Sequence, residues 1–168
     1  RRRLLSDDEI RCLPDLIMLV LPKVYAITDR SISGLSHSKQ VRQLIDGGIR
    51  LIQLREKNFA PHHWIDDAML AAEIARENGA TLIVNDRVEI AIAIAADGVH
   101  LGQTDLPAEA ARRLLGPEKI VGISTHDLWQ VKDAMLQPVD YIAFGPIFTT
   151  TTKLDPDVVT GVEMLGKV

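Results

Sequence analysis

The sequence predicts an α/β fold in which parallel strands alternate with helices. Three observations support this: six short apolar runs recur along the chain, amphipathic stretches separate them, and glycine or proline follows most of those stretches. Strands that are apolar on both faces are typical of a parallel sheet covered by helices. With 168 residues, 46% of them hydrophobic and 25% charged, the chain has the size and composition of one globular domain.

The six apolar runs are the predicted strands. They occupy residues 23–28, 51–54, 81–85, 98–101, 120–124 and 141–145. Their spacing of roughly 20 to 30 residues fits right-handed strand–helix–strand units. Two architectures remain open from the residues alone, a doubly wound sheet and a (β/α) barrel.

The clearest predicted helix spans residues 61–78, where apolar residues follow helical spacing, Pro61 suits a first turn and Gly79 supplies a stop. Further helices are predicted at residues 39–46, 108–115 and 127–136, with another beginning near Gly161. We expect residues 1–22 to form a helical extension, with a helix around residues 6–20, and residues 23–168 to form the α/β domain.

Composition argues against several classes of partner. The net charge is −4 and the pI is about 5.7, whereas nucleic-acid and anionic-membrane surfaces select clustered Lys and Arg. Cys12 is the single cysteine, so no internal disulfide forms, and the short apolar run at 16–21 does not make a signal peptide. We therefore expect a cytoplasmic protein with small-molecule partners, and a homo-oligomer remains open.

Polar residues follow the second predicted strand at Gln53, Arg55 and Lys57. Period-two alternation places these three side chains on one face, and Leu54 and Glu56 on the other. In parallel α/β proteins ligands bind at the carboxyl ends of the strands. The alternative is a frayed strand end with solvated charges.

Carboxylates follow the next two predicted strands. Asn85 and Asp86 end the third strand, and Asp105 follows the fourth. Mg²⁺ usually takes one or two carboxylates together with phosphate oxygens of a substrate, so this pair predicts a magnesium–diphosphate site. The alternative is that Asn85-Asp86 is a turn capping the helix near Val88, and that Asp105 caps the helix near Pro107.

Hydroxyl groups and one ammonium group follow the last two predicted strands. Residues 145–153 offer Thr150, Thr152 and Lys153, and residues 122–126 offer Ser124 and His126. A polar loop and helix-capping residues are the plainer interpretations. His37 is placed in a turn and His62 and His63 at a solvated helix start, and their spacing does not suit a transition metal.

Taken together, these motifs resemble those of the thiamine phosphate synthase family. The matching segments, in order, are QLREK (53–57), ND (85–86), HLGQTD (100–105), GISTH (122–126) and GPIFTTTTK (145–153). The resemblance covers residues 23–166 and implies a (β/α)₈ barrel. It also implies a transferase that joins hydroxymethylpyrimidine diphosphate to thiazole phosphate and releases diphosphate.

The resemblance assigns roles by position. Asp86 and Asp105 are the implied Mg²⁺ ligands. The implied substrate-binding residues are Gln53, Arg55, Lys57, Asn85, His100, Ser124, Thr150, Thr152 and Lys153. Of these, Arg55, Lys57, Ser124 and Lys153 are also implied to be catalytic, because they neutralise or contact the departing diphosphate.

The sequence departs from the family at its C-terminal end. Only about six βα units precede Val168, so the last two of the barrel are missing, and six strands leave two unpaired edges. We expect either a longer polypeptide or a partner that covers the gap. The alternative functions are a related thiazole tautomerase, which has a histidine at the position of His126, and a non-catalytic thiamine-phosphate or diphosphate binding protein.

Overall fold

The computed structural model describes residues 19–149 and 158–168, and shows a single six-stranded parallel sheet. Its strands are β1 (Ala26–Thr28), β2 (Leu51–Leu54), β3 (Thr81–Asn85), β4 (Gly98–Leu101), β5 (Ile120–Thr125) and β6 (Tyr141–Phe144). All five pairings between neighbours are parallel. The six predicted strands are confirmed, with β1 shorter than predicted because pairing with β2 begins at Ala26.

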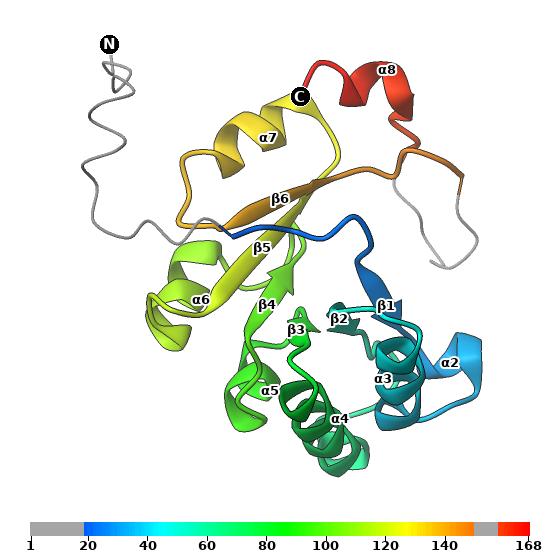
Figure 1. Cartoon of the computed structure of the whole chain (residues 1–168). Helices are drawn as coiled ribbons and strands as arrows, with labels where there is room; N and C mark the ends of the chain where they lie inside the picture. The colour runs from blue at the N-terminus through cyan, green and yellow to red at the C-terminus, as the bar shows by residue number, and fades with distance from the viewer. Residues whose placement is uncertain (1–18, 150–157) are drawn as a thin grey trace, which may run out of the picture.

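The strand order decides between the two architectures. The strands follow one another as β1-β2-β3-β4-β5-β6, whereas a doubly wound sheet reverses direction next to its first strand. Figure 1 shows the sheet curling with its helices on the outer side. The expected incomplete (β/α)₈ barrel is therefore confirmed, and both β1 and β6 are edge strands.

Most helices lie close to their predicted positions, whereas the short helix that follows β1 was not predicted. They are α2 (Arg30–Ser33), α3 (His37–Asp46), η1 (Pro61–His63), α4 (Ile65–Glu77), α5 (Val88–Ala93), α6 (Ala108–Leu115), α7 (Leu128–Ala134) and α8 (Gly161–Leu165). The predicted helix at 61–78 is divided into η1 and α4 at Trp64. The φ of Trp64 is −141°, outside the helical range, and its indole is buried. Asp127 lies outside α7 and caps it, accepting a hydrogen bond from the Gln130 N–H.

The two faces of the sheet have different surroundings. On the outer face, alternate strand residues join helix residues in one apolar core, which includes Ile52, Leu54, Leu82, Val84, Val99, Leu101 and Val121. On the inner face lie the intervening residues, among them Leu51, Gln53, His100 and Tyr141, all buried. This period-two pattern places the polar strand residues inside the curl of the sheet.

The predicted N-terminal helix falls mainly on residues 1–18, outside the described part of the chain. Residues 19–22 are described and have no regular structure, so the expected end of that helix at Val20 is not observed. Within the described ranges, no helix combines the length and apolar character needed to cross a bilayer.

Candidate functional site

The carboxyl ends of β2, β3 and β4 bring together the first three groups of predicted site residues. Lys57 follows β2, Asp86 follows β3 and Asp105 follows β4. Because these strands are adjacent and parallel, their ends meet at one edge of the sheet.

Asp86 lies at the centre of this edge. Its carboxylate forms an ion pair with the Lys57 ammonium group and lies close to the Asp105 carboxyl. Burial raises the pKa of Asp86; the Lys57 charge opposes that rise and the Asp105 carboxyl adds to it. Two carboxylates and one ammonium group thus converge on one partly buried point.

Backbone geometry holds both carboxylates in place. Asp86 has a φ of 62°, in the left-handed region that Asp tolerates better than most residues, and its N–H donates to the His100 carbonyl at 2.8 Å. Asp105 accepts a 2.7 Å hydrogen bond from the Gly102 N–H. A Cβ at position 102 would lie 3.0 Å from that same carboxylate oxygen, so glycine permits the close approach.

Neither carboxylate caps a helix. The N-cap residues of α5 and α6 are Arg87 and Pro107, and neither helix has a side-chain cap. The capping interpretation of Asn85-Asp86 and of Asp105 is therefore wrong, and a helix terminus does not explain these acidic residues.

The Arg55 side chain contacts a residue that was not predicted from the sequence. Its guanidinium forms an ion pair with Asp29, which directly follows β1 and caps α2. Burial alone would raise the pKa of Asp29, but hydrogen bonds from Ser31 and Ile32, together with the Arg55 charge, lower it. Asp29 was not among the predicted site residues, and the pairing of β1 with β2 brings it beside Arg55.

Glu56 faces the opposite side, as the alternation predicted, and is buried against α3. Its Oε1 accepts a 3.0 Å hydrogen bond from the Asn58 N–H, and its Oε2 lies 3.5 Å from Nε2 of His37. His37 was predicted in a turn, but it begins α3, is fully buried, and contacts Thr28 Oγ1 at 2.7 Å through Nδ1. The Glu56–His37 contact therefore anchors the segment that carries Arg55 and Lys57.

Gln53 and His100 lie inside the curl and belong to one hydrogen-bonded chain. Gln53 Nε2 donates to the Tyr25 hydroxyl at 3.0 Å, and the Tyr25 and Tyr141 hydroxyls are 3.1 Å apart. The Tyr141 hydroxyl is 2.9 Å from Nδ1 of His100, and Nε2 of His100 is 2.8 Å from Ser124 Oγ. Both tyrosines were missed because they occupy apolar runs.

The ends of β3, β5 and β6 complete the inner surface. Asn85 on β3 pairs in register with His100 on β4, so it lies next to one member of the hydrogen-bonded chain described above. His126 Nδ1 lies 2.5 Å from the Gly145 carbonyl, and a cavity of about 180 Å³ opens beside it, lined by Ser124, His126, Phe144 and neighbours. Since Asp127 caps α7, the capping interpretation of Ser124 and Thr125 is wrong. Thr150, Thr152 and Lys153 lie outside the described residues.

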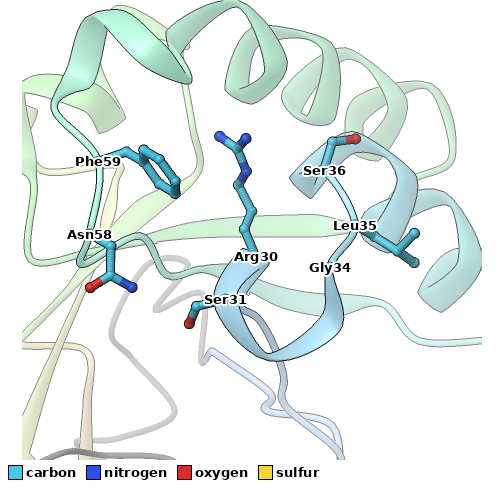
Figure 2. Close-up of a pocket in the computed structure, with 7 residues that line it drawn as sticks. All are labelled: Arg30, Ser31, Gly34, Leu35, Ser36, Asn58 and Phe59. Atoms are coloured by element: carbon cyan, nitrogen blue, oxygen red, sulfur yellow. The ribbon is translucent and has the colours of Figure 1, made fainter.

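A second cavity, of about 270 Å³, lies between the segments that follow β1 and β2. It is lined by Arg30, Ser31, Gly34, Leu35, Ser36, Asn58 and Phe59. Figure 2 shows the Arg30 side chain extending alongside the Phe59 ring, with 4.8 Å between the guanidinium carbon and the ring centroid. One wall is α2 with the turn after it, which follow β1, and the other is the loop that follows β2, so the cavity lies at the carboxyl ends of these two strands.

The residues at this edge suit a magnesium ion that is shared with a substrate. Within residues 19–149 and 158–168, no group of three or more His, Cys, Asp or Glu side chains could hold a metal. The Asp86–Asp105 pair supplies two oxygen ligands, which fits Mg²⁺ because that ion usually keeps water or phosphate oxygens in its other positions. Burial, together with the neighbouring Asp105 carboxyl, raises the pKa of Asp86, and a dication held by these residues would offset the repulsion between the two carboxylates.

Comparison with known proteins identifies the family of the chain. The family model described as thiamine monophosphate synthase matches residues 24–168. The thiamine-phosphate synthase of Lawsonia intracellularis is 47% identical over 133 residues, covering 79% of this chain and 61% of the relative. That of Chloroflexus aurantiacus is 42% identical over 147 residues, covering 87% of this chain and 68% of the relative.

A solved structure gives the same result. The thiamine phosphate pyrophosphorylase from Pyrococcus furiosus superposes with a TM-score of 0.74 and 34% identity, covering 85% of this chain and 67% of that one. The chain thus spans roughly two thirds of the length of these relatives. On its sequence and on its fold, the chain belongs to the thiamine monophosphate synthase family.

Proposed function

We propose that the protein acts as a thiamine-phosphate synthase, which couples hydroxymethylpyrimidine diphosphate with thiazole phosphate to give thiamine phosphate and diphosphate. The observation that carries this proposal is the cluster of Lys57, Asp86 and Asp105 at adjacent strand ends. Relatives named thiamine-phosphate synthase favour it over the tautomerase and over a non-catalytic binding protein.

The reaction requires stabilisation of a leaving group. The bond between the pyrimidine methylene carbon and a diphosphate oxygen breaks, and the thiazole nitrogen then forms a bond to that carbon. Negative charge grows on the departing oxygen, so cationic groups placed there lower the barrier. Lys57 and Arg55 would supply that charge, and Lys153 would add to it. No nucleophilic side chain is needed.

Asp86 and Asp105 would hold Mg²⁺, which when bound supplies positive charge to the diphosphate oxygens. Lys57 already contacts Asp86, so its ammonium group is placed to reach a phosphate oxygen bound beside that carboxylate. Arg55, held by Asp29, would bind the diphosphate from the β1 side.

The remaining polar residues would bind and orient the substrates. Gln53, Asn85 and His100 lie deeper, where their inner-face positions suit the pyrimidine ring. Ser124 would donate to a diphosphate oxygen, and Thr150 and Thr152 would bind the thiazole phosphate. A cytoplasmic location and a possible homo-oligomer remain predictions from the sequence.

The direct test is an assay of the full-length protein with both substrates and Mg²⁺, in which thiamine phosphate is quantified by chromatography. We expect product in the wild type and a loss of about 100-fold or more in Asp86→Ala. Absence of product, together with Mg²⁺-dependent ligand binding, would instead support the binding-protein alternative. Turnover unchanged in Asp86→Ala would reject the proposed site.

A further inference from the structure

A chain of four hydrogen bonds crosses the inside of the curled sheet. It runs from Gln53 through Tyr25, Tyr141 and His100 to Ser124. These residues come from β2, β4, β5, β6 and the position just before β1. The two tyrosines, 116 residues apart in sequence, link the N-terminal and C-terminal edges of the described sheet.

The chemistry of these groups determines which one donates in each hydrogen bond of this chain. An amide NH₂ group can only donate, so the Tyr25 oxygen accepts from Gln53 and its hydrogen is left for Tyr141. The Tyr141 hydrogen is then left for Nδ1 of His100. If Tyr141 donated to Tyr25 instead, the Tyr25 oxygen would accept from both Gln53 and Tyr141. The Tyr25 hydrogen would then point to neither of these two partners.

The direction of donation determines the tautomer of His100 and the role of Ser124 in the hydrogen bond between them. When Nδ1 of a neutral imidazole accepts a hydrogen bond, the proton resides on Nε2. Nε2–H of His100 then donates to Ser124 Oγ at 2.8 Å. Because Ser124 accepts this bond, its own hydrogen remains available to donate to another group.

Packing around Tyr141 shows that this arrangement is built into the sheet. The Tyr141 ring stacks on His100, with centroids 5.5 Å apart, and meets the Tyr25 ring edge-on at 6.1 Å. A Cβ at Gly122 would lie 2.1 Å from the Tyr141 ring, so the absence of a side chain there makes room for the phenol. Burial raises the pKa of both phenols, which keeps them protonated as the direction requires.

We propose that Tyr141 is a positioning residue for Ser124: through His100 it directs the Ser124 hydroxyl hydrogen toward the departing diphosphate. This inference rests on the proposed synthase function. Tyr141 itself need not touch the substrate. Its hydroxyl holds His100 with the proton on Nε2, and without it His100 can rotate or change tautomer and accept the Ser124 hydrogen instead.

A double-mutant cycle between Tyr141→Phe and Ser124→Ala tests the coupling. We expect Ser124→Ala to lower kcat by about 100-fold, and Tyr141→Phe by about tenfold with little change in KM for the pyrimidine diphosphate. The double variant should be no slower than Ser124→Ala alone, because both changes remove the same interaction. Losses that multiply, or full kcat in Tyr141→Phe, would overturn the proposal.

Tyr25→Phe is the matched control, since it removes the other hydroxyl of the same ring pair. Tyr141 keeps its hydrogen for His100 in that variant, so we expect a smaller loss of kcat than in Tyr141→Phe. Equal losses in the two variants would overturn the proposal, because only Tyr141→Phe removes the hydroxyl that contacts His100. Thermal unfolding of each variant identifies any that do not fold.

A spectroscopic measurement separates this proposal from the proposed function. The ¹⁵N chemical shifts of His100 report its tautomer without any substrate, and we expect the Nε2–H form in the wild type and a mixed or Nδ1–H form in Tyr141→Phe. An Nδ1–H form in the wild type would overturn the proposal. If the tautomer is as expected and no thiamine phosphate forms, the synthase function fails and the hydrogen-bond direction stands.

Discussion

The Lys57 ammonium group forms an ion pair with the Asp86 carboxylate, across the ends of two neighbouring strands. Asp86 also faces Asp105, so its carboxylate lies between a positive and a negative neighbour. A substrate diphosphate with its metal would satisfy all three groups: the ion would bind both carboxylates, and Lys57 would turn to a phosphate oxygen.

Replacement of Lys57 by Gln should lower kcat/KM by about 100-fold, because one of the charges on the leaving group is lost while most of the side chain's length is kept. The measurement is steady-state formation of thiamine phosphate at saturating Mg²⁺. Lys132→Gln is the matched control, since Lys132 is exposed on α7, away from the strand ends. Equal activity in the two variants would remove Lys57 from the site.

The Asp29→Asn variant should separate the effect of Asp29 on Arg55 from its effect on the cap of α2. The amide oxygen can still accept from the Ser31 and Ile32 N–H groups and so preserve the cap of α2, but the charge that orients Arg55 is lost. We expect KM for the pyrimidine diphosphate to rise about tenfold with the melting temperature nearly unchanged. A lowered melting temperature with normal KM would instead assign Asp29 to the helix cap alone.

Gly122→Ala should destabilise the protein by about 1–3 kcal/mol or more, because the added methyl group meets the Tyr141 ring in a closed interior. Urea denaturation measures this change. Gly166→Ala is the control: its Cβ would make only ordinary contacts, with the nearest carbonyl oxygen 3.6 Å away, so stability should not fall. Equal stability of the two variants would mean that Tyr141 does not occupy the space beside Gly122.

Folding stability should decrease below about pH 6.5 because of His37. Burial lowers the pKa of His37; Glu56 and Asp67 oppose this, and Arg30 adds to it. The folded pKa is below the unfolded value of 6.5, so the unfolded chain binds the proton more readily. This contribution is complete above about pH 6.5 and is lost as the pH falls through the folded pKa, with a slope of at most about 1.4 kcal/mol per pH unit.

Urea denaturation at pH 7.5 and 5.5 checks this contribution. His37→Gln should lose less stability between the two pH values than the wild type, whereas His62→Gln, at an exposed position, should behave as the wild type does. Asp29 and Asp67, whose pKa values are lowered, contribute in all three proteins, and that stability is lost only as the pH falls below about 3.8. The same pH dependence in His37→Gln and the wild type would contradict the assignment.

The fold could be predicted from the sequence because its signals are local. Apolar runs and terminating glycines mark strands and helices without knowledge of their partners, and polar residues after a strand mark the ligand-binding edge. The choice between a barrel and a doubly wound sheet depends on strand order, which no local pattern of this chain encodes. The family resemblance supplied it, and the sequential order confirms it.

The supporting residues could not be predicted in the same way. Tyr25 and Tyr141 sit in apolar runs, and their shared hydrogen bond appears only when distant strands are placed inside one curl. His37 looked like a turn residue because its burial depends on Trp64 and Glu56, which come from other segments. Long-range contacts of this kind require coordinates.

Asp86 and Asp105 are proposed to bind diphosphate through a shared Mg²⁺ ion. Calorimetric titration of inorganic diphosphate into the full-length protein, with and without Mg²⁺, tests this proposal most directly, with Asp86→Asn, Asp105→Asn and the exposed-site control Asp46→Asn measured in parallel. We expect tight binding only with Mg²⁺, lost in the first two variants and kept in the third. Equal affinity with and without Mg²⁺, or unchanged Mg²⁺-dependent binding in both site variants, would contradict it.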